Sequence, residues 1–130
     1  MAPPLVAVVD DDHSVREALA RLIRSVGLGV RVFASAEEFL AGSPGRHPDC
    51  LILDIRMPGM NGLELQKALA VTDRDLPVIF ITAHGSDEEV RGRAMSAGAV
   101  DYLLKPLKED EVLKALGTAL NAQNDEGGVA

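Results

Sequence analysis

The sequence predicts a doubly wound α/β domain, in which helices cover both faces of a five-stranded parallel sheet. Short apolar runs rich in β-branched residues are separated by segments with helical spacing. Most of these runs are continuous rather than alternating, which is typical of parallel strands buried on both faces. Strands that alternate with helices imply right-handed crossovers, and 130 residues are enough for one such domain.

Each element has its own signal in the sequence. The predicted strands are Leu5–Val9, Val30–Phe33, Cys50–Leu53, Val78–Thr82 and Val100–Leu104. Apolar stripes of helical period predict a first helix around residues 15–26 and a last one around 112–120. Capping residues three positions before a Glu mark three more helix starts, at Ser35, Asn61 and Ser86. We assign residues 1–123 to the domain and the polar, Gly-rich residues 124–130 to a flexible tail or the start of a linker.

Composition narrows the possible functions. The chain has 20 acidic and 13 basic residues, a net charge of −7, which opposes direct nucleic-acid binding because that requires a basic surface. Its apolar runs are too short to span a membrane, and the N-terminus lacks the basic region of a signal peptide. The single cysteine, Cys50, lies in an apolar run and is expected to be buried. A cytoplasmic protein without disulfides is therefore expected.

Polar side chains collect where the predicted strands end. The first strand ends in Asp10-Asp11-Asp12, the third in Asp54, the fourth in Thr82 and the fifth in Lys105. In an open α/β sheet, ligands bind beyond the carboxyl ends of the strands, so these side chains form the candidate site.

Each of these residues alone also has a simpler structural interpretation. The three acids could cap the next helix, Asp54 could form a turn, Lys105 could reach from the sheet edge to solvent, and Thr82 is common at strand ends. Together, however, converging carboxylates would repel one another unless a cation compensated them. Hard oxygen ligands without a Cys or His cluster favour Mg2+ over Zn2+.

A metal beside a lysine and a hydroxyl is typical of a phosphoryl-transfer site. Asp54 is the candidate nucleophile, because carboxylates can form acyl phosphates and a strand end holds the group rigidly. Lys105 and Thr82 would contact phosphoryl oxygens around it.

At this point the sequence closely resembles the receiver domain of bacterial two-component response regulators, the CheY-like family. The motifs that carry the resemblance are VVDDD, LILDIRMPGMNGLEL, VIFITAHG and AGAVDYLLKPL, in that order, and they extend from Leu5 to about Ala122. The segments LDIRMPGMNG and ITAHG are most similar to receivers of the nitrogen-fixation regulator type. The resemblance implies a flavodoxin-like strand order of 2-1-3-4-5.

The resemblance also implies roles for individual residues. Asp54 would be the phosphoacceptor, and Mg2+ would be bound by Asp10, Asp11, Asp54 and the backbone carbonyl of Arg56. Thr82 and Lys105 would contact the phosphoryl group, and Lys105 would precede a cis peptide to Pro106. Tyr102 would be the switch residue that turns inward when Thr82 moves. The side chains of Arg56 and His84 would border the water route and tune the lifetime of the phosphoaspartate, or else lie in solvated loops.

The family implies a phosphoacceptor switch rather than an enzyme with turnover. Its partners would be a sensor histidine kinase or a phosphotransfer protein, together with an output domain or partner protein that controls transcription, and phosphorylation would support a homodimer. The chain departs from the family pattern between Thr82 and Lys105, where it is one residue longer, and Gly92 weakens the helix there, so a mobile segment is expected.

Three rival interpretations fit the sequence less well. A pseudo-receiver, an interaction module without phosphorylation, usually lacks part of the acidic and lysine set, which is complete here. A haloacid-dehalogenase-type phosphatase would need an acid where Arg56 stands. A flavin-binding module would need a phosphate loop after the first strand, and no Ser/Thr/Gly-rich loop follows it.

Overall fold

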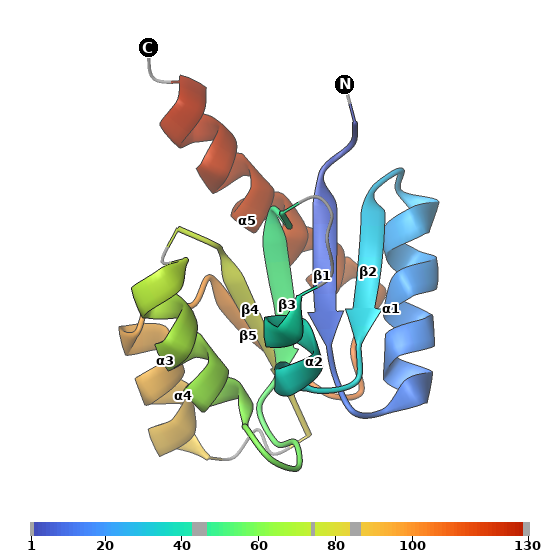
Figure 1. Cartoon of the computed structure of the whole chain (residues 1–130). Helices are drawn as coiled ribbons and strands as arrows, with labels where there is room; N and C mark the ends of the chain where they lie inside the picture. The colour runs from blue at the N-terminus through green and yellow to red at the C-terminus, as the bar shows by residue number, and fades with distance from the viewer. Residues whose placement is uncertain (1, 43–46, 74, 84–86, 129–130) are drawn as a thin grey trace.

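The predicted fold is confirmed by the computed structural model, which describes residues 2–42, 47–73, 75–83 and 87–128. Five parallel strands form one sheet in the order β2-β1-β3-β4-β5 (Figure 1). The strands are β1 Leu5–Val9, β2 Gly29–Phe33, β3 Cys50–Asp54, β4 Val78–Thr82 and β5 Asp101–Leu104. The helices are α1 His13–Ser25, α2 Ala36–Ala41, α3 Gly62–Thr72, α4 Glu88–Ser96 and α5 Glu109–Gly128.

The sheet is covered on both faces, which explains its continuous apolar strands. All five residues of β3 are buried. Leu51 and Leu53 pack in the core cluster that includes side chains from α2, α3 and α4, whereas Cys50 and Ile52 pack in the cluster with α1 and α5. Alternate side chains of one strand thus enter different cores, which is why Cys50 to Leu53 are all apolar and only the final residue, Asp54, is polar.

The helix starts follow the predicted capping patterns with one correction. Ser35 Oγ accepts the N–H of Glu38 at 3.0 Å, and the bonds of a full capping box join Asn61 and Glu64. At α4, however, the N-cap is Asp87 rather than the predicted Ser86, and its Oδ1 accepts the N–H of Val90 at 3.1 Å. A carboxylate caps as well as a hydroxyl and also interacts favourably with the helix dipole.

Helix α5 is longer than the sequence indicates. We predicted a last helix around residues 112–120 and a tail or linker from residue 124, but the helix continues to Gly128. The apolar stripe of the helix stops near residue 120, but backbone hydrogen bonds can continue a helix without an apolar face. The end of the stripe therefore did not predict the end of the helix. That residues 124–130 lie outside the domain stays a prediction, as does the mobility of the segment around α4. No helix among the described residues has both the length and the apolar character needed to cross a membrane.

Candidate functional site

The carboxyl ends of the strands lie along one rim of the sheet, where the arrowheads of Figure 1 point. Asp10 directly follows β1, and Asp54 ends β3, the strand that pairs with β1. One carboxylate oxygen from each of Asp10, Asp11 and Asp54 lies within 4.8 Å of the others. The acidic cluster expected from the strand ends is therefore present. Its neighbour Asp12 instead caps α1, with Oδ1 accepting the N–H of Ser14 at 2.8 Å.

Asp10 is fully buried and held through its backbone and side chain. Its N–H donates to the carbonyl of Phe33 at 3.1 Å, and its carbonyl accepts from Arg16 Nη1 at 2.8 Å. Its Oδ1 accepts the N–H of Asp12 at 2.8 Å. The other oxygen, Oδ2, is buried and faces Lys105 Nζ at 2.9 Å, and no other group of the described residues donates a hydrogen bond to it. This oxygen therefore has lone pairs available to a cation.

Lys105 is the cation that faces the acidic cluster. Its Nζ lies 2.9 Å from Asp10 Oδ2 and 3.6 Å from Asp54 Oδ1. Burial alone would lower the pKa of the Lys105 amine, but its hydrogen bond to Asp10 and the negative charges of Asp10 and Asp54 outweigh burial and raise it. Lys105 is thus charged, yet one amine cannot neutralise three carboxylates.

The protein environment disfavours the ionised form of Asp54. Asp54 is 4% exposed, and the pKa of its carboxyl is raised to about 6, with burial as the largest cause. The charge of Asp10, and to a smaller extent that of Asp11, contributes to this increase, whereas Lys105 opposes it. A divalent cation at the cluster would remove this repulsion and keep Asp54 ionised.

The residues present fit a divalent metal ion. The cluster supplies carboxylate oxygens, and Asp10 Oδ2 is a buried acceptor whose partner among the described residues is the Lys105 ammonium. Asp11 is exposed, so part of the coordination shell would face water. Few protein oxygens combined with retained waters is the arrangement that Mg2+ prefers.

Three further predicted residues, Thr82, Tyr102 and Pro106, lie on β4, on β5 and just after β5. Thr82 is buried at the end of β4, and its carbonyl accepts the N–H of Lys105 at 2.8 Å. The Lys105–Pro106 peptide is cis, as predicted. Tyr102 is buried, and its hydroxyl has no hydrogen-bond partner among the described residues. Burial and the charge of Asp87 raise the Tyr102 pKa, while the nearby cation of Arg91, 5.8 Å from the ring centroid, opposes the shift.

Of the two residues expected to tune the phosphoryl lifetime, the structure describes Arg56 but not His84. The side chain of Arg56 is 57% exposed and forms an ion pair with Asp87 Oδ2 at 3.6 Å. Arg56 thereby joins the loop after β3 to the N-cap of α4, a contact that the sequence did not predict. His84 lies outside the described residues.

Comparison with known proteins agrees with this geometry. Residues 6–117 match the sequence profile of the response regulator receiver domain. The chain belongs to the response regulator receiver family. This receiver is 46% identical over 116 residues to the response regulator protein TmoT of Ectopseudomonas mendocina, an alignment that covers 89% of this chain and 52% of TmoT.

Relatives of the nitrogen-fixation type are also similar to this receiver, as predicted. It is 37% identical to the transcriptional regulatory protein FixJ of Bradyrhizobium diazoefficiens over 88% of this chain and 56% of FixJ. It matches the crystal structure of FixJ-N with a TM-score of 0.81 and 38% identity, covering 93% of this chain and 96% of that one. The receiver spans about half the length of TmoT and FixJ.

A further residue of the receiver contacts the loop after the candidate phosphoacceptor, and the sequence analysis did not predict this contact. Glu37 Oε2, on α2, accepts the N–H of Met60 at 2.9 Å. The two residues are 23 positions apart, and no local pattern connects them. The only available signal was the glutamate in the first turn of α2, which reads as a favourable interaction with the helix dipole.

Proposed function

We propose that this receiver accepts a phosphoryl group on Asp54 from the phosphohistidine of a sensor histidine kinase or a phosphotransfer protein. The observation that carries the proposal is the convergence of Asp10, Asp11, Asp54 and Lys105 at one rim of the sheet. Three carboxylates beside the Lys105 amine leave a site with net negative charge. A bound cation would reduce the repulsion between the carboxylates, and an electrophilic phosphorus would be attracted to them.

The transfer would exchange one bond for another at phosphorus. An oxygen of the Asp54 carboxylate forms a P–O bond while the P–N bond to the histidine breaks, and the electron pair leaves with the histidine nitrogen. Lys105 Nζ, which lies 3.6 Å from Asp54 Oδ1, would bind one equatorial oxygen of the phosphoryl group. The hydroxyl of Thr82, at the end of the neighbouring strand, would donate to another.

Asp10, Asp11, Asp54 and the backbone carbonyl of Arg56 would hold Mg2+ at this site. The bound ion would supply positive charge to the transferring phosphoryl oxygens. The gathering of three carboxylates around the Lys105 amine and the raised pKa of Asp54 support this assignment, because both indicate a site that lacks positive charge.

The same site would control an output surface made of α4, β5 and α5. Movement of Thr82 towards the phosphoryl group would let Tyr102 turn inward, and side chains of Arg56 and His84 would set how fast water removes the phosphoryl group. The buried Tyr102 hydroxyl, which lacks a hydrogen-bond partner in the part of the chain that the structure describes, supports a ring with a second available position. The receiver would therefore switch itself and would not turn over a substrate.

The output would be transcription, carried by a further domain or a partner protein. This assignment rests on relatives such as FixJ, named transcriptional regulatory protein, of which the receiver matches about half. The domain would comprise residues 1–123, residues 124–130 would begin a linker, and phosphorylation would favour a homodimer. Reaction with a kinase's phosphohistidine would take place in the cytoplasm, and the net charge of −7 opposes nucleic-acid binding by this domain itself.

Intact mass spectrometry tests the phosphoacceptor. Wild type and Asp54→Asn are incubated with Mg2+ and acetyl phosphate, and one phosphoryl adduct is expected on wild type alone. An adduct that persists in Asp54→Asn would assign the phosphoryl group to another residue. Absence of an adduct from both proteins would favour the pseudo-receiver, an interaction module that is not phosphorylated.

A further inference from the structure

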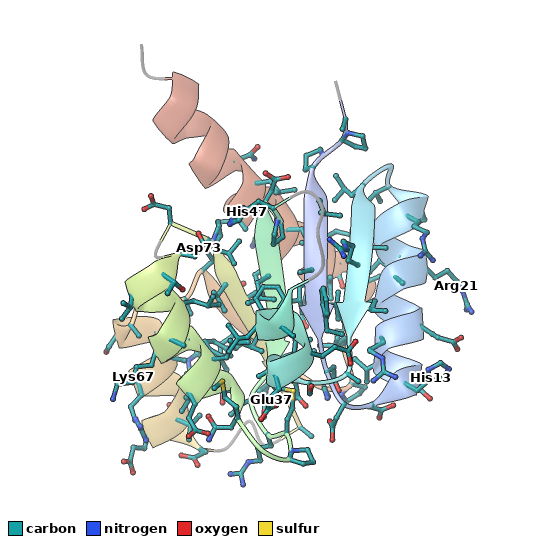
Figure 2. The ribbon with its side chains drawn as sticks, in the orientation of Figure 1. His13, Arg21, Glu37, His47, Lys67 and Asp73 are labelled. Atoms are coloured by element: carbon teal, nitrogen blue, oxygen red, sulfur yellow. The ribbon has the colours of Figure 1, made fainter. Side chains whose placement is uncertain are left out.

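The carboxylate of Glu37 contacts the loop between β3 and α3 from the side of α2. Besides accepting the N–H of Met60 at 2.9 Å, this carboxylate accepts from its own backbone N–H, and the bond from Met60 is the larger cause of a lowered Glu37 pKa. Figure 2 places Glu37 near the carboxyl-end rim of the sheet, the rim that bears the acidic cluster. An acid that looks like an ordinary solvent-facing residue of a helix is therefore bonded to the loop that follows Asp54.

Gly59 gives the loop the shape that this contact requires. Its φ is +74°, a left-handed conformation that favours glycine. A Cβ at this position would lie 2.6 Å from Glu37 Oε2. The backbone at Gly59 thus passes directly against the carboxylate, which adds close packing to the hydrogen bond at Met60.

The other end of the loop is fixed on Asp54 itself. A Cβ on Gly62 would lie 2.4 Å from the backbone oxygen of Asp54, and the N–H of Gly62 donates to the carbonyl of Ile55 at 2.8 Å. Arg56, whose carbonyl is a proposed Mg2+ ligand, lies in the same loop, between Ile55 and Met60. The position of that carbonyl depends on a loop held at Gly62 by packing and at Met60 by Glu37.

We propose that Glu37 is a positioning residue, which holds the loop from Ile55 to Asn61 in the conformation that presents Asp54 and the Arg56 carbonyl to the metal ion and the phosphoryl group. This inference rests on the proposed function and extends it to α2, an element that contributes no residue to the acidic cluster. Groups that orient metal ligands typically change metal affinity by about tenfold or more when they are removed.

The neighbouring Glu38 supplies a matched control. It occupies the same first turn of α2, carries the same charge and is exposed, and no contact of its carboxylate with the loop is described. Glu37→Ala and Glu38→Ala therefore change helix propensity and the interaction with the helix dipole equally. Only Glu37→Ala removes the bond to Met60. Glu37→Gln removes the charge but keeps an oxygen that can accept the same N–H.

The experiment measures three quantities on each variant of the 130-residue chain. Hydrogen exchange of the Met60 amide reports the bond, an NMR titration with Mg2+ gives the Kd of the metal, and intact mass follows the rate of phosphorylation by acetyl phosphate. We expect Glu37→Ala to speed exchange at Met60 about tenfold, as the loss of a single hydrogen bond would. It should also weaken Mg2+ binding and slow phosphorylation by a similar factor, while Glu38→Ala and Glu37→Gln stay close to wild type.

Two results would overturn the inference. Equal exchange at Met60 in Glu37→Ala and Glu38→Ala would show that the bond does not hold the loop. Faster exchange with unchanged Mg2+ affinity and phosphorylation rate would show a contact without a positioning role. Failure of the proposed function can be told apart from failure of this inference, because in that case the wild-type protein itself forms no phosphoryl adduct. Exchange at Met60 and the affinity for Mg2+ would then still decide the role of Glu37.

Discussion

Lys105 Nζ lies 2.9 Å from Asp10 Oδ2, and this amine is the cation paired with a fully buried carboxylate. Removing one member of a buried ion pair leaves the other charge without compensation, which typically costs about 3 kcal/mol or more. Loss of one partner alone should therefore destabilise the receiver as well as change its site.

Lys105→Gln should lower the free energy of unfolding by about 3 kcal/mol in the absence of metal, because Asp10 loses its partner. The same variant should bind Mg2+ more tightly than wild type, since an opposing positive charge is gone, and saturating Mg2+ should restore much of the stability. Urea unfolding with EDTA or Mg2+ measures both effects. The exposed Lys108 provides the control: if Lys108→Gln were equally destabilising, the loss would reflect general charge rather than the pair.

Asp54→Asn should stabilise the metal-free receiver at pH 7.5. The folded pKa of Asp54, about 6, lies above its ordinary value of 3.8. The folded state therefore holds the proton more tightly, and stability from this group decreases as pH rises from about 4 to 6. This decrease amounts to about 3 kcal/mol, and Asp54→Asn should recover it at pH 7.5 but not below pH 4.

Urea unfolding in EDTA at the two pH values checks this prediction, and the exposed Asp75 serves for comparison through Asp75→Asn. Added Mg2+ at pH 7.5 should stabilise wild type far more than Asp54→Asn. A variant that is less stable than wild type at pH 7.5 in EDTA would contradict the repulsion that raises the pKa.

Gly62→Ala should be strongly destabilising. Its Cβ would lie 2.4 Å from the oxygen of Asp54 and 2.9 Å from the Cα of Ile55, and both atoms belong to the backbone. Forced relaxation of a packed region costs about 1 to 3 kcal/mol. Gly117→Ala in α5 makes no such contact, and it should stabilise by up to about 1 kcal/mol. Thermal unfolding of the two variants should therefore shift in opposite directions, and parallel shifts would count against the close approach at Gly62.

Gly92→Ala should slow local opening of α4. A Cβ at this position has open space around it, and alanine is favoured over glycine inside a helix by about 1 kcal/mol. Hydrogen exchange of the amides in α4 should slow accordingly. Gly98 has equally open surroundings but a φ of +102°, so Gly98→Ala should destabilise instead. Unchanged amide exchange in Gly92→Ala would mean that the low helix propensity of glycine does not determine how often α4 opens.

The sheet and the acidic cluster could be predicted because their signals are local. The predicted strands agree with the observed ones to within one residue at each end. Because parallel strands end at the same edge of the sheet, Asp10, Asp54 and Lys105 were expected to lie together at the edge where ligands bind. The chemical roles of these residues stay predictions, because they came from the family resemblance.

Contacts between distant segments could not be predicted in this way. The bond from Met60 to Glu37 and the ion pair of Arg56 with Asp87 each join residues from separate elements. Their partners are ordinary charged side chains at helix starts, so the sequence gives each a complete local explanation. The shift of the α4 cap from Ser86 to Asp87 has the same origin, because adjacent residues were both good caps.

The burial of Cys50 makes its sulfur a natural reporter of unfolding. The side chain is fully inaccessible at the start of the middle strand, and burial raises the pKa of the thiol to about 12. Alkylating reagents react with thiolates, so modification of the native protein requires that β3 leave the sheet. As the single cysteine of the chain, it lets the labelling rate measure how often this receiver opens, without any engineered probe.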